Sequence, residues 1–108
     1  LDVSSGGNHP DQHPHVKAAY QADFAIEIKR KVGDSMAVSS VGVINSAELA
    51  NRLLEKDGLD AIFVGRGFQM NPGLVFQWAE DLGQPIQLPN QIRWGIVGRG
   101  QKQRKPVP

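Results

Sequence analysis

Short apolar runs alternate with longer amphipathic stretches from the first residue of the chain to about residue 83. Runs of this length are typical of β-strands, and the apolar spacing between them is typical of α-helices. The strands are predicted at residues 1–3, 35–41 and 61–64. The helices are predicted at residues 18–32, at residues 46–56, and from Pro72 to a stop at Gly83. The third strand is wholly apolar, which predicts a strand buried on both faces.

The predicted helices carry recognisable start signals. Asn45 is the expected N-cap of the second helix, because Glu48 three residues later completes a capping-box pair. Asn71 is the expected N-cap of the third helix, because Pro72 would then occupy the first helical position. In the first helix one face is predicted to be buried. Its residues are Phe24, Ala25, Ile28 and Val32.

Strands that alternate with helices, without hairpin turns, predict an α/β fold with a parallel sheet and right-handed crossovers. The carboxyl ends of parallel strands meet at one edge, where ligands of such sheets bind. All three ends carry glycine: residues 6 and 7, Gly42, and Gly65 with Gly67. Glycine lets backbone N–H groups approach an anion, and Arg66 adds a forked, permanently charged donor set. Gly42, Gly65 and Arg66 are therefore a candidate phosphate site; a plain turn with a surface arginine is the alternative.

Composition narrows the function classes. A chain of 108 residues has room for one small domain or part of a larger one. Twelve basic residues against 11 acidic ones argue against a nucleic-acid or membrane-surface binder. The absence of cysteine excludes a disulfide scaffold, a thiolate metal site and a cysteine nucleophile. No apolar run reaches the roughly 20 residues of a membrane span. The start lacks an initiator methionine and a signal pattern, so we expect a cytoplasmic segment of something longer.

Two polar stretches invite other interpretations. His9, His13 and His15 lie in a proline-containing connection without the partner spacing of a zinc site, so we expect solvated histidines and no metal. From residue 84 onward prolines and glycines interrupt every periodic stretch, and the basic end (QKQRKPVP) is expected to be disordered.

Four segments together resemble the old yellow enzyme family, most closely its bacterial- and fungal-type NADPH dehydrogenase branch. They are DVSSGG (2–7), AYQADFAIEI (19–28), AVSSVGVINSAELAN (37–51) and DAIFVGRGFQMNP (60–72). The resemblance implies a (β/α)8 TIM barrel that binds FMN, takes hydride from NAD(P)H and reduces enone-type substrates. The chain would be the C-terminal part, about the last three β/α units, with residues 1–83 as partial barrel and 84–108 as tail. A homo-oligomer is compatible with this reading.

The resemblance also implies roles for particular residues. Gly42, Gly65 and Arg66 match the positions that hold the FMN phosphate, whereas the family's catalytic tyrosine and histidine pair lie on earlier strands that this chain lacks. The chain is thus expected to hold no catalytic residue and to be inactive alone. Relatives commonly have proline-glycine where this chain has Ala18 and Ala19. Arg93 loosely matches an arginine that reaches a neighbouring subunit's active site in some relatives; an ordinary surface arginine is the alternative.

Other readings stay open. Three parallel strands cannot close a barrel, so two edges and one sheet face should be exposed and the isolated chain marginally stable. A non-catalytic remnant acting as a small interaction module is the main alternative. A dihydroorotate dehydrogenase or tRNA-dihydrouridine synthase relative fits the SSGG and YQ segments less well.

Overall fold

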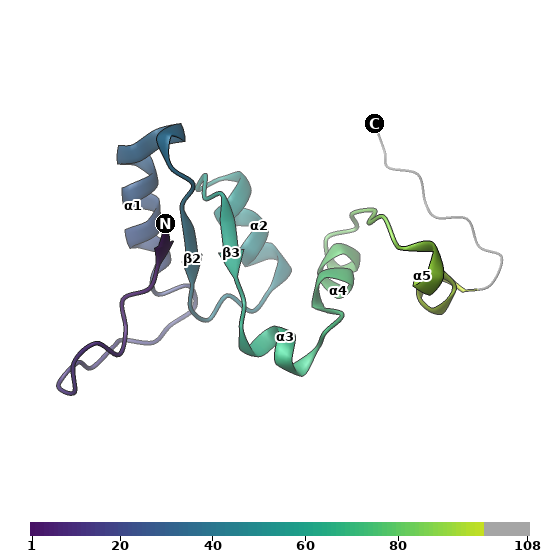
Figure 1. Ribbon diagram of the computed structural model, residues 1–108, viewed down its shortest axis with the longest axis horizontal. Coiled ribbons are helices and arrows are strands. Elements are labelled where there is room, and N and C mark those ends of the chain that lie inside the picture. Colours follow the sequence, from purple (N-terminus) through teal and green to yellow (C-terminus); the bar gives the residue numbers. More distant parts are fainter. Residues whose placement is uncertain (99–108) are drawn as a thin grey trace. The chain divides into compact units, whose positions relative to one another are not determined.

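The computed structural model describes residues 1–98, which form an α/β fold with a small parallel sheet (Figure 1). The chain divides into two compact units, Leu1–Pro72 and a second that begins at Gly73, and each is described by itself. The predicted boundary at residue 83 refers to a barrel in a longer protein and stays a prediction. The predicted disorder of residues 101–108 lies outside the described residues.

The sheet of the first unit has the order β1-β2-β3, with every pair parallel. Its strands are β1 (Asp2–Val3), β2 (Ser39–Val41) and β3 (Ala61–Phe63). Asp2 pairs with Ser39, and Ser39 pairs with Ala61. Helices α1 (Ala22–Val32) and α2 (Ala47–Glu55) connect successive strands, so the predicted alternation and the parallel pairing are confirmed. Strand β2 begins later than predicted, because a short 3₁₀ turn, η1 (Gly33–Ser35), follows α1.

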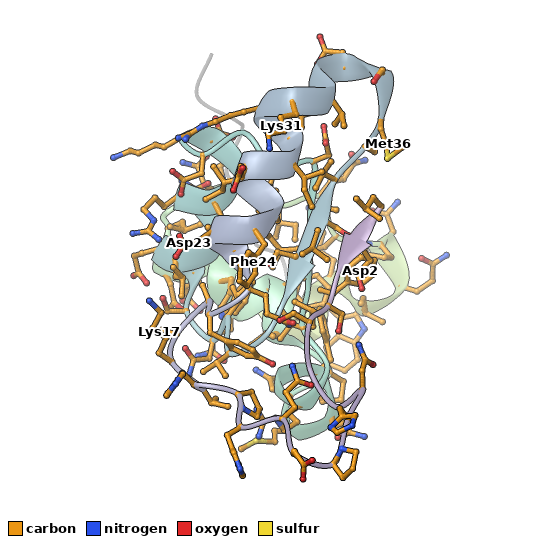
Figure 2. All side chains as sticks on the ribbon, turned by 90° about the vertical axis from the view of Figure 1, so that its left-hand side faces the viewer. Asp2, Lys17, Asp23, Phe24, Lys31 and Met36 are labelled. Carbon is orange, nitrogen blue, oxygen red and sulfur yellow. The ribbon has the colours of Figure 1, made fainter. Side chains whose placement is uncertain are left out.

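The start of α1 and its buried face differ from the prediction. The chain turns at Ala19, whose φ of 50° lies in the left-handed region, and the Ala19 N–H donates to the carbonyl of Val43. The helix therefore begins at Ala22 rather than at residue 18. Its buried positions are Ala22 and Ala25, whereas Phe24 is 55% exposed and lies on the face of α1 seen in Figure 2. The expectation that Phe24 is buried was wrong, because the helix packs on the sheet through its small residues.

Helix α2 begins one residue later than predicted. Its N-cap is Ser46 rather than Asn45, and the Ser46 hydroxyl accepts a hydrogen bond from the backbone N–H of Leu49 at 3.3 Å. A serine hydroxyl that satisfies an N–H of the first turn is a favourable cap, which explains the shift. The helix then buries Ala47, Ala50 and Leu53.

One face of the sheet is covered by helices and the other is open. Val3, Val38 and Ser40 are buried on the covered face, because α1 packs against β1 and β2 and α2 packs against β3. On the other face Phe63 is 54% exposed and Ala61 is also exposed. The prediction that β3 is buried on both faces is therefore wrong for this chain, since β3 is an edge strand with one open face. The predicted exposure of a sheet face is confirmed.

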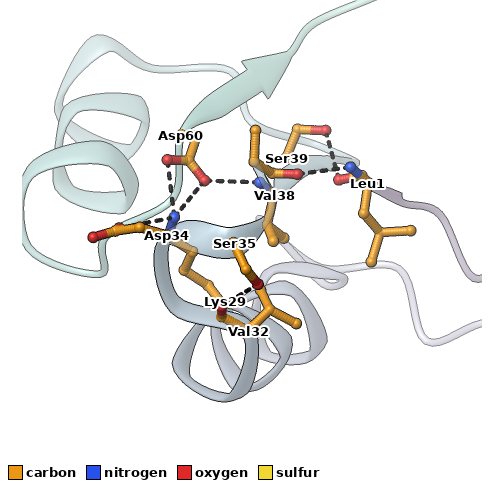
Figure 3. A network of polar contacts seen from close by, with 9 residues as sticks. Leu1, Lys29, Val32, Asp34, Ser35, Val38, Ser39 and Asp60 are labelled. Atoms are coloured by element: carbon orange, nitrogen blue, oxygen red, sulfur yellow. Dashed lines mark hydrogen bonds and ion pairs between the residues drawn. The ribbon is translucent and has the colours of Figure 1, made fainter.

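A polar cluster joins the amino ends of β2 and β3 to α1 (Figure 3). Lys29 contacts both carboxylate oxygens of Asp60, at 3.0 and 2.9 Å, and the Val38 N–H donates to the same carboxylate at 2.7 Å. The Lys29 hydrogen bond and the Val38 N–H hold the pKa of Asp60 below its usual value. Ligands of parallel α/β sheets bind at the carboxyl ends of the strands, whereas this cluster lies at their amino ends. The cluster therefore contributes to the stability of the fold.

The described part of the second unit holds two helices, α4 (Leu74–Asp81) and α5 (Asn90–Val97). Helix α4 is capped by Gly73 and not by Asn71, which instead ends the preceding helix, and Gly83 follows it with a φ of 64°. Helix α5 corrects the expectation that glycines and prolines prevent a helix after residue 84: Pro89 serves as its N-cap residue, and Gly95 is tolerated inside it. Within residues 1–98 no helix is long and apolar enough to span a membrane.

Candidate functional site

The candidate site lies where the three strands end. Val41 pairs with Phe63, so Gly42 comes directly after the paired position on β2, and Gly65 two residues after it on β3. Figure 1 shows the loop after β1 and the start of α3 leaving the sheet at the same end. Neighbouring strands lie about 5 Å apart. The sequence prediction that the glycine-bearing ends share one edge is confirmed by this topology.

Gly65 and Arg66 stand at the junction of β3 and a short helix, α3 (Arg66–Met70). The sequence predicted a turn here, but the backbone turns directly into helix, with Gly65 as N-cap at a φ of −81°. A Cβ built on Gly65 would meet no atom within 4 Å, so packing within the chain does not require glycine. Arg66 is exposed beside it. This open space and an exposed guanidinium are what an approaching anion needs.

Packing within the chain demands glycine at position 42. Its φ is 116°, and a Cβ there would lie 2.7 Å from Cε1 of Tyr20 and 2.9 Å from Nε2 of Gln21. Real Cβ atoms do not approach so closely, so any larger residue would displace Tyr20 or Gln21.

Gln21 is the residue of this edge that sequence reasoning did not assign. Its side chain is buried, with 2% of the residue exposed, although glutamine is mostly an exposed residue type. Its Oε1 accepts hydrogen bonds from the backbone N–H and, at 2.9 Å, from the hydroxyl of Ser5, and its Nε2 donates to the carbonyl of Val41 at 2.8 Å. One amide thus joins the chain after β1 to the end of β2. The only hint in the sequence is an amide one residue ahead of a helix.

The loop after β1 uses its polar groups internally. Gln12 accepts from the N–H groups of Gly7 and Asn8 and donates to the carbonyl of Ser5. Both donors of Ser5 are already engaged by Gln21. His9, His13 and His15 are exposed in this connection, as expected, and the described residues contain no group of three metal-binding side chains. Arg93 lies on α5 of the second unit.

The chain belongs to the old yellow enzyme family, since its relatives are NADH:flavin oxidoreductases and NADPH dehydrogenases, and the resemblance seen in the sequence is confirmed. A relative named NADH:flavin oxidoreductase FG08077, from Gibberella zeae, is 46% identical over 110 residues that cover 100% of this chain. A protein named NADPH dehydrogenase from Listeria innocua is 37% identical over 84% of the chain. Another of that name, from Geobacillus thermodenitrificans, is 35% identical over 88% of it.

The chain spans about a quarter of the length of these relatives, 26% to 27%. That share is consistent with the C-terminal portion implied by the sequence segments. No protein-family model matches the chain.

Proposed function

We propose that the chain is the C-terminal, FMN-phosphate-binding portion of an NAD(P)H:flavin oxidoreductase of the ene-reductase type. In this proposal β1, β2 and β3 are the sixth to eighth strands of a TIM barrel. The observation that supports it best is the common edge at which Gly42 and Gly65–Arg66 follow neighbouring parallel strands. Phosphate sites of such barrels commonly use the loops after strands seven and eight.

The residues present fit a phosphate group. Gly65 leaves open space beside its backbone, and the exposed Arg66 guanidinium can form a bidentate pair with phosphate oxygens. Gly42 contributes backbone only, because glycine has no side chain, and Tyr20 and Gln21 occupy the space where a Cβ would stand. The proposed division of labour is that Arg66 supplies charge while the two glycines allow close approach.

The chemistry that a bound FMN supplies is hydride transfer from NAD(P)H to the activated C=C bond of an enone-type substrate. The part of this chain is to anchor the phosphate end. The residues that position substrate and donate a proton belong, in this proposal, to strands outside the chain, so we expect the 108 residues alone to be inactive. Homo-oligomer formation by the whole enzyme is part of the same proposal.

The test is a flavin titration of the whole natural polypeptide that contains this segment, comparing FMN with riboflavin, which lacks the phosphate. Arg66→Ala should weaken FMN binding about tenfold to a hundredfold, since a hydrogen bond to a charged group contributes about 1.5–3 kcal/mol. Riboflavin binding should not change. Arg52→Ala, which removes an exposed arginine from α2, is the matched control and should leave both affinities unchanged. Equal loss of FMN and riboflavin binding in Arg66→Ala, or no FMN binding by the wild type, would refute the proposal.

One observation favours a second candidate, a non-catalytic interaction module. Large apolar side chains remain exposed on the first unit, among them Phe24, Phe63 and Met70. Large exposed apolar side chains can mark partner surfaces as well as missing parts of a fold. Under this alternative the 108-residue chain unfolds cooperatively by itself and binds no flavin. A chain that neither unfolds cooperatively nor finds a partner would exclude it.

A further inference from the structure

We infer that Gln21 is a positioning residue that sets the geometry of the phosphate-binding edge by tying the chain after β1 to the end of β2. The inference rests on the proposed function and deepens it. It assigns to Gln21 no contact with the flavin. Its effect passes through Ser5 and through Val41, the residue directly before Gly42.

The contacts of Gln21 have the character of a fixed joint. The side chain binds Ser5, which lies 16 positions before Gln21 in the sequence, and Val41, which lies 20 positions after it. The described partners of this amide are a backbone N–H, a hydroxyl and a carbonyl, so both its oxygen and its nitrogen are used. In a buried site such bonds are expensive to leave unmade, because no water replaces a lost partner. The amide therefore restricts both strand ends at once.

Tyr20, the residue before Gln21, reinforces the joint. Its ring occupies the space in which a Cβ of Gly42 would stand, and its hydroxyl lies 3.7 Å from the corresponding position at Gly6. Tyr20 and Gln21 thus touch both glycine-bearing ends that precede β3. They are themselves held by the left-handed turn at Ala19, whose N–H donates to the Val43 carbonyl. Position 42 must be glycine because Tyr20 and Gln21, held in this way, leave no room for a Cβ there.

The decisive variant is Gln21→Glu, which keeps the shape but changes the donor. An ionised carboxylate can still accept from Ser5, but it cannot donate to the Val41 carbonyl and repels it. A protonated carboxyl group can donate again. Burial beside a carbonyl raises the pKa of a glutamate above its ordinary value of about 4.3, so the variant should regain the wild-type contacts near about pH 5. Gln21→Met removes both contacts at every pH while keeping a side chain of similar length.

The experiment measures FMN and riboflavin affinity of the whole natural polypeptide and its variants at about pH 5 and about pH 8. Each variant is compared with the wild type at the same pH, because the phosphate itself takes up a proton near about pH 6. At the higher pH, Gln21→Glu should bind FMN about tenfold more weakly than the wild type, with riboflavin affinity unchanged. At the lower pH its FMN affinity should approach that of the wild type. Gln21→Met should be weak at both.

Two controls separate positioning from other effects. Gln12→Glu makes the same chemical change at an exposed amide of the same connection, where water replaces lost contacts, and should stay within about threefold of the wild type. Leu59→Ala creates a cavity just before β3, at the amino end of the sheet, and should lower stability while FMN affinity of the folded protein is kept.

The outcomes are distinct for the two proposals. In one outcome the wild type prefers FMN over riboflavin and this preference depends on Arg66, but folded Gln21→Glu and Gln21→Met bind FMN as well as the wild type does. This result overturns the inference and leaves the proposed function standing. A pH-independent loss in Gln21→Glu, equal for FMN and riboflavin, also overturns it. Absence of FMN binding by the wild type overturns both.

Discussion

Replacing Gly42 by alanine should destabilise the first unit strongly, for two separable reasons. The residue has a φ of 116°, a conformation that costs an L-residue about 1–3 kcal/mol. The added methyl would stand 2.7 Å from the Tyr20 ring and 2.9 Å from the Gln21 amide, and overpacking of this kind costs about 1–3 kcal/mol. The lower entropy of an unfolded alanine chain offsets about 0.4–1 kcal/mol. We expect a net loss of about 1–5.6 kcal/mol.

Two other glycines provide matched controls. Gly58 has a φ of 77°, but a Cβ there would meet nothing within 4 Å, so Gly58→Ala should cost only the backbone strain, about 1 kcal/mol. Gly65 has neither a positive φ nor a close neighbour, and Gly65→Ala should leave stability within about 0.5 kcal/mol or raise it slightly. Gly42→Ala thus tests steric clash together with backbone strain, Gly58→Ala tests backbone strain alone, and Gly65→Ala introduces neither.

The assay is urea unfolding followed by far-UV circular dichroism, with the same concentration of trimethylamine N-oxide in every sample to keep the weakest variant folded. The free energy of unfolding of a 72-residue unit is expected to be no more than about 4–11 kcal/mol. The predicted loss is therefore a large part of it. Tyr20→Ala in the Gly42→Ala background should recover at least about 1 kcal/mol beyond additivity. A Gly42→Ala loss no larger than that of Gly58→Ala, or no coupling to Tyr20, would refute the reasoning.

Three further predictions concern stability, each measured by urea midpoints. Because hydrogen bonds lower the pKa of Asp60 below its ordinary 3.8, the stabilising contribution of Asp60 is present above about pH 4 and is lost as pH falls through the folded pKa. Asp60→Asn should therefore be less stable than the wild type at about pH 7, and its stability should depend less on acid pH. An unchanged acid dependence would contradict this assignment. Ser46→Ala should cost about 1 kcal/mol, and Asn45→Ala clearly less; the reverse order would restore Asn45 as the cap. Ser40 is a buried hydroxyl for which no hydrogen-bond partner is found within the described part of the chain, so Ser40→Ala should be neutral or stabilising by about 1 kcal/mol, and a marked loss would indicate an unrecognised partner.

The fold was predictable where the signal is repetitive. Glycine after each apolar run located the strand ends, and the alternation of runs and amphipathic stretches located the parallel order, because both properties recur with every β/α unit. Boundaries were less predictable. Ser46 prevailed over Asn45 and Gly73 over Asn71, since several residues near each helix start are acceptable caps and only the packed geometry selects one.

Burial and polar contacts were the parts that sequence could not supply. Phe24 belongs to an apolar stripe, yet it is exposed because no part of the first unit covers that side of α1. Gln21 is polar, yet it is buried because its partners arrive from residues far along the chain. A periodicity reports which residues share a face but not what lies opposite that face. The candidate roles of Gly42, Gly65 and Arg66 remain predictions to be tested by flavin binding.

The parallel register has a consequence for how the chain folds. Contacts between the first two strands join residues 37 positions apart, whereas those between the second and third join residues 22 apart. Closing the longer loop costs about 0.5 kcal/mol more entropy, a small difference that still favours early pairing of β2 with β3 around α2. The two hydrogen bonds from Ser5 to the Gln21 amide can form only after β1 has docked. The chain after β1, which Gln21 ties to the proposed phosphate edge, would then be the last part of that edge to become rigid, and protection of the Ser5 amide from hydrogen exchange would report that final step.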